Sequence, residues 1–278
     1  FPMRPGTAKL MAAMASSLSC PPRVTHFTYC LGNALYVPLT SRSNSRTLPE
    51  LRGDNFVLPA SVVAALCRVR DAEAGTSQWA GWCAYLDTQE GPQKLPPALA
   101  YVAGLPQGEE EGQPTRDGLF QEIRQQLFEN KIQSIVFSGE GEPTLRMDDM
   151  LQLSQQVHDE ARKCSMSTTV RLTTNGLVAL SSCSEALQKC LAHGITHISV
   201  GLHTGLAGQY TELVQPCVAS EDEDAHKMVC HFIQEAVRLG LQVETTAVDR
   251  DDVDKEQTEA LSKSLGVSTP VRWRPYFP

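Results

Sequence analysis

From residue 132 to the end, the sequence alternates between short apolar runs of strand length and longer stretches with helical apolar spacing. Three of the helical stretches are followed directly by a glycine, at Gly194, Gly240 and Gly266, where a left-handed residue ends a helix at little cost. This alternation indicates right-handed βαβ units built around a parallel sheet. The expected strands are 132–138, 169–175, 197–204, 242–249 and 270–277, and the expected helices are 147–164, 183–194, 225–240 and 254–266.

The pattern continues less regularly toward the N-terminus, with an expected strand at 34–40 and expected helices at 58–73 and 115–130. Six strands are too few for a closed eight-stranded barrel, so an open barrel of six units and a doubly wound sheet both fit. We expect a single domain over residues 30–278, preceded by a tail at 1–29 that is disordered or a targeting segment. Residues 74–114, rich in Gly, Pro, Gln and Glu, are expected to form a loop-rich insertion whose aromatic residues pack onto the domain.

Charge is unevenly distributed along the chain. Residues 1–49 contain five Lys and Arg and no acid, while the remainder carries 19 basic against 32 acidic residues. This balance argues against a general nucleic-acid surface, which needs clustered positive charge. Because no window approaches 18 consecutive apolar residues, we expect no membrane span. The expected location is the cytoplasm, and the acid-free N-terminal stretch makes import into an organelle the alternative.

The nine cysteines are scattered, and no two are separated by only two to four residues. Compact zinc and iron–sulfur motifs need such short spacings, so neither is predicted. The odd count and the scatter also argue against a disulfide framework and fit a reducing compartment.

The carboxyl ends of parallel strands are where α/β proteins place their ligands. Here those ends carry Gly-Glu-Gly-Glu-Pro at 139–143 and Thr-Thr-Asn-Gly at 173–176. The first turn fits neither a dinucleotide-binding glycine motif nor a P-loop, because Thr144 stands where the third glycine belongs and no Gly-Lys-Ser/Thr follows. Carboxylates at such a turn suit a cationic ligand group, an ammonium or a sulfonium, better than a phosphate. Of the seven histidines only His203 follows a strand, which makes it the one weak candidate for a catalytic or ligand-contacting histidine.

Charged residues also occupy strand interiors, where they must pair if that face of the sheet is enclosed. We expect Glu142 or Glu244 to pair with one of three strand arginines. These arginines are Arg171, Arg272 and Arg274.

Taken in order, "SIVFSGEGEPTLRMDDML", "VRLTTNGL", "HISVGLHT", "QYTELVQP" and the terminal "VRWRPYF" resemble the radical SAM superfamily, most closely its TatD-associated branch. The resemblance covers about residues 30–278 without the insertion. It implies a partial (β/α)6 barrel, open on one side, that binds S-adenosylmethionine at the strand carboxyl ends. By this resemblance Gly139, Gly141 and Glu142 would hold the amino group of S-adenosylmethionine, and Thr173, Asn175 and Ser199 would lie beside its nucleoside.

The sequence departs from that family at the iron–sulfur motif. The family places Cys-x3-Cys-x2-Cys after its first strand to bind a four-iron four-sulfur cluster, whereas here the matching positions are Ser43, Thr47 and Glu50. None supplies a thiolate, the ligand that such clusters require. The cluster is therefore not expected in this protein.

Three functions remain open, and the sequence does not decide whether the chain is an enzyme. The first is a pseudoenzyme-like barrel that binds S-adenosylmethionine or a related small ligand without radical chemistry. The second is a working radical SAM enzyme with non-standard cluster ligands. The third is an inactive barrel that serves as an interaction module, with the 74–114 insertion as its partner surface.

Overall fold

The computed structural model describes residues 27–76, 78, 80–89, 91–96, 114–129, 132–217 and 224–278. Its main element is a sheet of seven strands in the order β1-β2-β5-β6-β7-β8-β9. The first pair is antiparallel and every later pair is parallel. The strands are β1 (Tyr29–Leu31), β2 (Ala34–Val37), β5 (Ser134–Phe137), β6 (Thr169–Thr174), β7 (Ile195–Gly201), β8 (Gln242–Asp249) and β9 (Arg272–Pro275).

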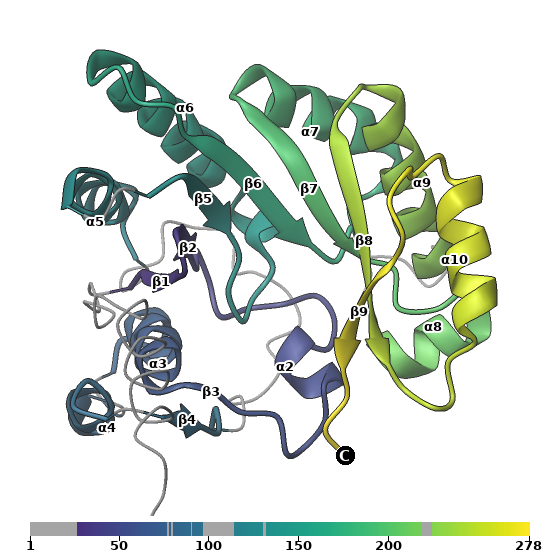
Figure 1. The fold of residues 1–278 in the computed structure, drawn as a ribbon, viewed down its shortest axis with the longest axis horizontal. Coiled ribbons are helices and arrows are strands. Elements are labelled where there is room, and N and C mark those ends of the chain that lie inside the picture. The colour runs from purple at the N-terminus through teal and green to yellow at the C-terminus, as the bar shows by residue number, and fades with distance from the viewer. Residues whose placement is uncertain are drawn as a thin grey trace, which may run out of the picture.

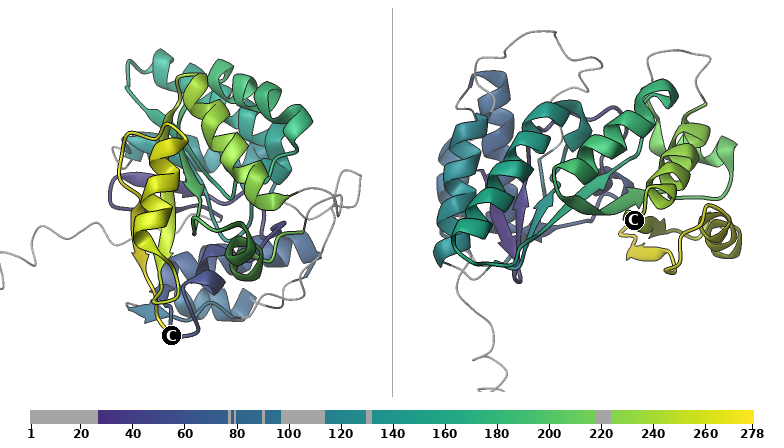
Figure 2. Two further views of the ribbon diagram at one scale, coloured as in Figure 1. Left: turned by 90° about the vertical axis from the view of Figure 1, so that its right-hand side faces the viewer. Right: turned by 90° about the horizontal axis from the view of Figure 1, so that it is seen from above.

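The sheet curls into a half-barrel, and the helices divide between its two sides (Figure 1). The convex side is covered by α5 (Arg116–Glu129), α6 (Met147–Lys163), α7 (Leu180–Ala192), α9 (Ala225–Arg238) and α10 (Lys255–Ser264). Figure 2 shows these helices as one layer that follows the curl of the sheet. The remaining elements are α2 (Leu48–Leu51), α3 (Ala60–Ala74), α4 (Ala80–Leu86), α8 (Ala207–Val214), the 3-10 turn η1 (Pro143–Arg146) and a small ribbon of β3 (Leu58–Pro59) with β4 (Pro92–Gln93).

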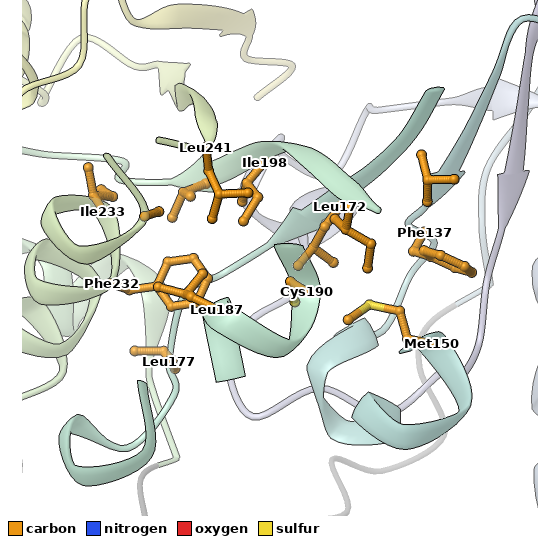
Figure 3. Close-up of a cluster of buried hydrophobic side chains, with 14 of the residues drawn as sticks. Phe137, Met150, Leu172, Leu177, Leu187, Cys190, Ile198, Phe232, Ile233 and Leu241 are labelled. Atoms are coloured by element: carbon orange, nitrogen blue, oxygen red, sulfur yellow. The ribbon is translucent and has the colours of Figure 1, made fainter. Parts of the chain in front are cut away.

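Alternation along the strands decides which side chains meet the helices. In β6, Val170 and Leu172 are buried toward the convex side, while Thr169, Arg171 and Thr173 are half-buried on the concave side. Leu172 packs in a continuous apolar core that fills the space between sheet and helices (Figure 3). Burying such a side chain stabilises the fold by about 1.5–3 kcal/mol. The core therefore lies entirely on the convex side of β6, which leaves its concave face polar.

The expectation of six parallel strands is confirmed, and the curled sheet selects the open partial barrel over the doubly wound sheet. The main sheet contains β1 as well, a strand that the sequence pattern did not indicate and that pairs with the free edge of β2. All six expected helices are present, with ends that differ by a few residues. Within the described residues, no helix combines the length and apolar character needed to cross a membrane.

In the described part of the insertion, the helix α4 packs on α3 through Cys83 and Leu86. The prediction that its aromatic residues pack onto the domain is wrong for Trp82 and Tyr85, which are 37% and 50% exposed. Their rings stack on each other, with centroids 5.4 Å apart. Trp79 lies outside the described residues.

Candidate functional site

Glu142 lies in the turn after β5, at the mouth of the half-barrel, and its carboxylate is buried. One oxygen, Oε1, accepts hydrogen bonds from Thr144 N at 3.0 Å, Thr144 Oγ1 at 2.8 Å and Thr174 Oγ1 at 2.8 Å. The other, Oε2, accepts from Asn175 N at 2.7 Å. Burial raises the pKa of Glu142, and these hydrogen bonds oppose the rise. The carboxylate thus clamps the β5 turn to the end of β6, and in the described part of the chain it has no cationic partner.

The two glycines of the turn allow close approach by the protein's own backbone. A Cβ at Gly139 would lie 2.5 Å from Cβ of Pro38, and one at Gly141 would lie 2.5 Å from the carbonyl oxygen of Thr40 and 2.8 Å from Arg42 N. Contacts this short exclude any side chain at Gly141 unless the backbone moves. The turn is closed further by Glu142 N, which donates to Arg42 O at 2.8 Å.

Asn175, at the carboxyl end of β6, uses its whole side-chain amide inside the protein. Its Nδ2 donates to Asn44 Oδ1 at 2.6 Å and to Ser45 Oγ at 3.0 Å, and its Oδ1 accepts from Leu177 N at 3.0 Å. Asn175 therefore fastens the segment that follows β2 across the mouth of the barrel.

That segment, residues 40–53, holds Ser43, Thr47 and Glu50, which the family resemblance predicts at the cluster-binding positions. Thr47 N and Thr47 Oγ1 both donate to Glu50 Oε2, at 2.7 and 2.9 Å, at the start of α2. This is the capping arrangement of a Ser/Thr-x-x-Glu sequence, and it satisfies groups that a helix start otherwise leaves free. Arg46 N donates to Val214 O at 2.8 Å and Phe277 N to Arg52 O at 2.7 Å, so the segment spans from β2 to β9.

The donor set of this segment does not fit an iron–sulfur cluster. Ser43 and Thr47 offer hydroxyl groups and Glu50 a carboxylate, and none is the thiolate that the cluster needs. The Thr47 hydroxyl and the Glu50 carboxylate are moreover bonded to each other. Among the described residues, no group of three or more His, Cys, Asp and Glu side chains could hold a metal ion.

Two further carboxylates, Glu140 of the turn after β5 and Glu73 of α3, form hydrogen bonds near the same strand ends. Glu140 and Arg70 form a buried bidentate ion pair, with Arg70 Nε 2.7 Å from Glu140 Oε2 and a second bond from Nη2 to Oε1. Burial raises the pKa of Glu140, and Arg70 opposes the rise. Glu73 accepts hydrogen bonds from Ser41 N at 2.9 Å and from the hydroxyls of Thr40 and Ser41.

His203 follows β7 in a left-handed backbone conformation, with φ of 61°. Such a φ is uncommon for a residue with a side chain and is found preferentially at functional sites. Its imidazole occupies the space left by Gly201, where a Cβ would lie 2.6 Å from Nε2. Burial and, to a lesser extent, the positive charge of Arg274 lower the pKa of His203 to about 4. The ring is therefore neutral at physiological pH.

Most of the predicted site residues surround one cavity of about 80 Å³ at the strand carboxyl ends. His203 and Arg46 line it as well, and the half-buried Arg46 side chain has no hydrogen-bond or ion-pair partner among the described residues. Ser199 lies away from the cavity and donates to Glu244 Oε1 at 3.0 Å, and Glu50 faces a neighbouring cleft of about 520 Å³ behind α2. The predicted residues that line the cavity are Ser43, Thr47, Gly139, Gly141, Glu142, Thr173 and Asn175.

The expected pairing of Glu142 or Glu244 with a strand arginine is confirmed through Glu244, and Glu142 takes no part in it. Arg272 Nη1 lies 3.5 Å from Glu244 Oε1, whereas Glu142 bonds only to hydroxyl and backbone N–H groups. Sequence reasoning missed Arg70, Glu73 and Arg46. Arg70 and Glu73 are charged residues in a largely apolar helix, and such residues indicate a buried polar network. The sequence does not tell which strand end they contact.

Comparisons with known proteins add little to this picture. No family model matches the chain, and no curated protein matches it. Among solved structures it is similar to HydG, a maturase of the [FeFe]-hydrogenase, with a TM-score of 0.43 and 12% identity over 62% of this chain and 38% of that one. An O-GlcNAc hydrolase mutant from Thermobaculum terrenum gives a TM-score of 0.30 and 12% identity over 57% of this chain and 36% of that one. The chain thus spans little more than a third of the length of either protein.

Proposed function

We propose that this protein binds the amino-acid group of S-adenosylmethionine, or of a related small molecule, at the mouth of the half-barrel and performs no radical chemistry there. The observation that carries the proposal is the buried Glu142 carboxylate, which lines the cavity without a cationic partner in the described part of the chain. A buried negative charge with only neutral donors is stabilised strongly by an incoming cation. An ammonium group in the cavity supplies that cation.

Arg46 is a suitable partner for the carboxylate of the same amino-acid group. Arg46 lines the same cavity, and a guanidinium binds a carboxylate through two parallel hydrogen bonds. Glu142 and Arg46 together suit the ammonium and the carboxylate of an α-amino acid.

The size of the cavity limits what it holds. Sites for whole drug-sized ligands usually measure about 300–1,000 Å³, whereas this cavity measures about 80 Å³. It accommodates an amino-acid head group, and the nucleoside must extend outward past residues 43–48. The absence of a fitting cluster donor set at Ser43, Thr47 and Glu50 supports binding without radical cleavage.

Titration calorimetry with S-adenosylmethionine, methionine and adenosine tests the proposal. We expect the first two to bind and adenosine alone to bind more weakly, and we expect Arg46→Gln to weaken the first two by about tenfold or more, or 1.4 kcal/mol. Arg162→Gln is the matched control, because it removes the same charge from an exposed position on α6. If neither amino acid binds at millimolar concentration, the proposal is wrong.

A second function, as an interaction module, is favoured by the exposed Trp82–Tyr85 pair on α4. Trp and Tyr are over-represented among the residues that dominate protein–protein binding. Crosslinking of the protein in its native extract, compared between wild type and Trp82→Ala, tests this function. Loss of a specific crosslinked species in the variant supports it, and identical patterns argue against it.

A further inference from the structure

The last two strands carry a second cluster of charge, on the concave face and away from the turn after β5. Arg272 pairs in register with Thr246, and Arg274 with Val248. Trp273 between them faces the convex side, where its Nε1 donates to Glu259 Oε1 at 3.0 Å. Because side chains alternate along a strand, both arginines point into the half-barrel.

A third arginine reaches the same place from the end of α2. Arg52 donates from Nε to Pro275 O at 3.1 Å, and its guanidinium lies over the ring of Phe56, 4.1 Å from the centroid, and 5.2 Å from that of Phe277. These contacts hold the Arg52 guanidinium beside the carboxyl end of β9, and Figure 1 shows α2 next to that strand.

Among the described residues, one carboxylate contacts the positive charge of this cluster. Glu244 is the acid that faces it, and its Oε1 is shared between Arg272 at 3.5 Å and Ser199 at 3.0 Å. Three guanidinium groups against one carboxylate leave two positive charges. The Nε of Arg274 is buried and has no hydrogen-bond partner among the described residues. Burial lowers the pKa of Arg274, and the charges of Arg272 and Arg52 lower it further.

A buried donor without an acceptor, next to two like charges, is unfavourable unless a ligand supplies the acceptor. Guanidinium groups bind phosphate and carboxylate oxygens in the same bidentate way. We propose that the concave face at β8 and β9 binds a small organic dianion, a phosphoric ester or a dicarboxylate, through Arg272 and Arg274 with Arg52 at the rim.

This inference goes beyond the amino-acid site, because it uses none of the residues that line the cavity at the turn, and either site could be present without the other. In the half-barrel the anion would sit on the open side, next to the Arg272 side chain, which is 56% exposed. The site thus has a route from solvent as well as a buried donor at its inner end.

Calorimetric titration of the full chain with pyrophosphate and with succinate tests the proposal, with sodium chloride at matched ionic strength as the reference. We expect at least one of the two dianions to bind, and we expect Arg274→Gln to weaken that binding by tenfold or more while Arg162→Gln, an exposed charge on α6, leaves it unchanged. The stronger of the two probes identifies whether the ligand class is a phosphoric ester or a dicarboxylate. Equal binding by wild type and Arg274→Gln, or no binding beyond the effect of chloride, overturns the proposal.

The melting temperature of the ligand-free variant separates a binding role from a structural one. Because Arg274 stands beside two like charges and lacks a partner for Nε, its replacement should leave the melting temperature unchanged or raise it. A marked fall means that the fold itself needs Arg274. In that case Arg272→Gln, which changes an exposed side chain, decides by the same titration: retained dianion affinity overturns the proposal, and lost affinity supports it.

Discussion

Replacing Glu142 by alanine should destabilise the protein severely, because the carboxylate joins two strand ends. It accepts four hydrogen bonds, two of them from the backbone N–H groups of Thr144 and Asn175. Each hydrogen bond to a charged group contributes about 1.5–3 kcal/mol, and each buried donor left without a partner costs about 1–3 kcal/mol. Removal of the unfavourably buried charge offsets part of this loss. We therefore expect Glu142→Ala to lower the free energy of unfolding by about 3–5 kcal/mol.

Glutamine at the same position makes the prediction more specific. Glu142→Gln retains an acceptor for the Thr144 and Thr174 donors but turns an NH₂ group toward Asn175 N, so we expect a smaller loss of about 1–3 kcal/mol. Urea unfolding followed by circular dichroism measures both, with the exposed Glu185→Ala as a control that should leave stability unchanged. If Glu142→Ala costs less than about 1 kcal/mol, the carboxylate is not the clamp that we describe.

Three further perturbations test neighbouring parts of the site. The pKa of His203 is about 4 in the folded protein and 6.5 in the unfolded chain. The free energy of unfolding should therefore be highest above pH 6.5 and fall by roughly 3 kcal/mol as the pH falls to 4. The pH dependence of urea unfolding should therefore be flatter in His203→Asn, and identical slopes would contradict the buried neutral ring. Gly141→Ala should destabilise by more than about 1 kcal/mol because its Cβ meets backbone, whereas Gly208→Ala, an open helical position, should stabilise by about 0.5–1 kcal/mol. Differential scanning calorimetry distinguishes the two signs. Finally, Glu140→Leu alone should lower the free energy of unfolding by about 3–5 kcal/mol by leaving the buried Arg70 without its carboxylate partner, and the double variant with Arg70→Met should recover most of that loss in chemical denaturation, unless the ion pair itself supplies the stability.

Much of the architecture could be predicted from the sequence, because the repeat of strand and helix periods is a local property. The parallel strands, the convex helices and the polar strand ends all follow from patterns within a few residues of each other. β1 could not be predicted in this way, since a three-residue strand carries too little pattern, and its edge pairing depends on β2 already being in place.

The sequence predicted which residues lie together at the cavity, but not how they bond to one another. The sequence brought Gly141, Glu142 and Asn175 to one place, yet it could not show that Gly141 makes room for Arg42 or that the Asn175 amide binds Asn44. These are contacts between segments about 100 residues or more apart, which no local pattern encodes. A Ser/Thr-x-x-Glu signal was present at Thr47–Glu50, and it predicts the cap of α2 that the structure contains.

The central claim is that the mouth of this half-barrel can hold an amino-acid group but cannot carry out radical cleavage. The most direct test is to treat the purified protein with iron and sulfide under anaerobic conditions, add a strong reductant and S-adenosylmethionine, and quantify 5′-deoxyadenosine by chromatography. We predict S-adenosylmethionine bound but intact, with no 5′-deoxyadenosine above the protein-free control. A brown, cluster-containing protein that forms 5′-deoxyadenosine in proportion to its own concentration would contradict the account.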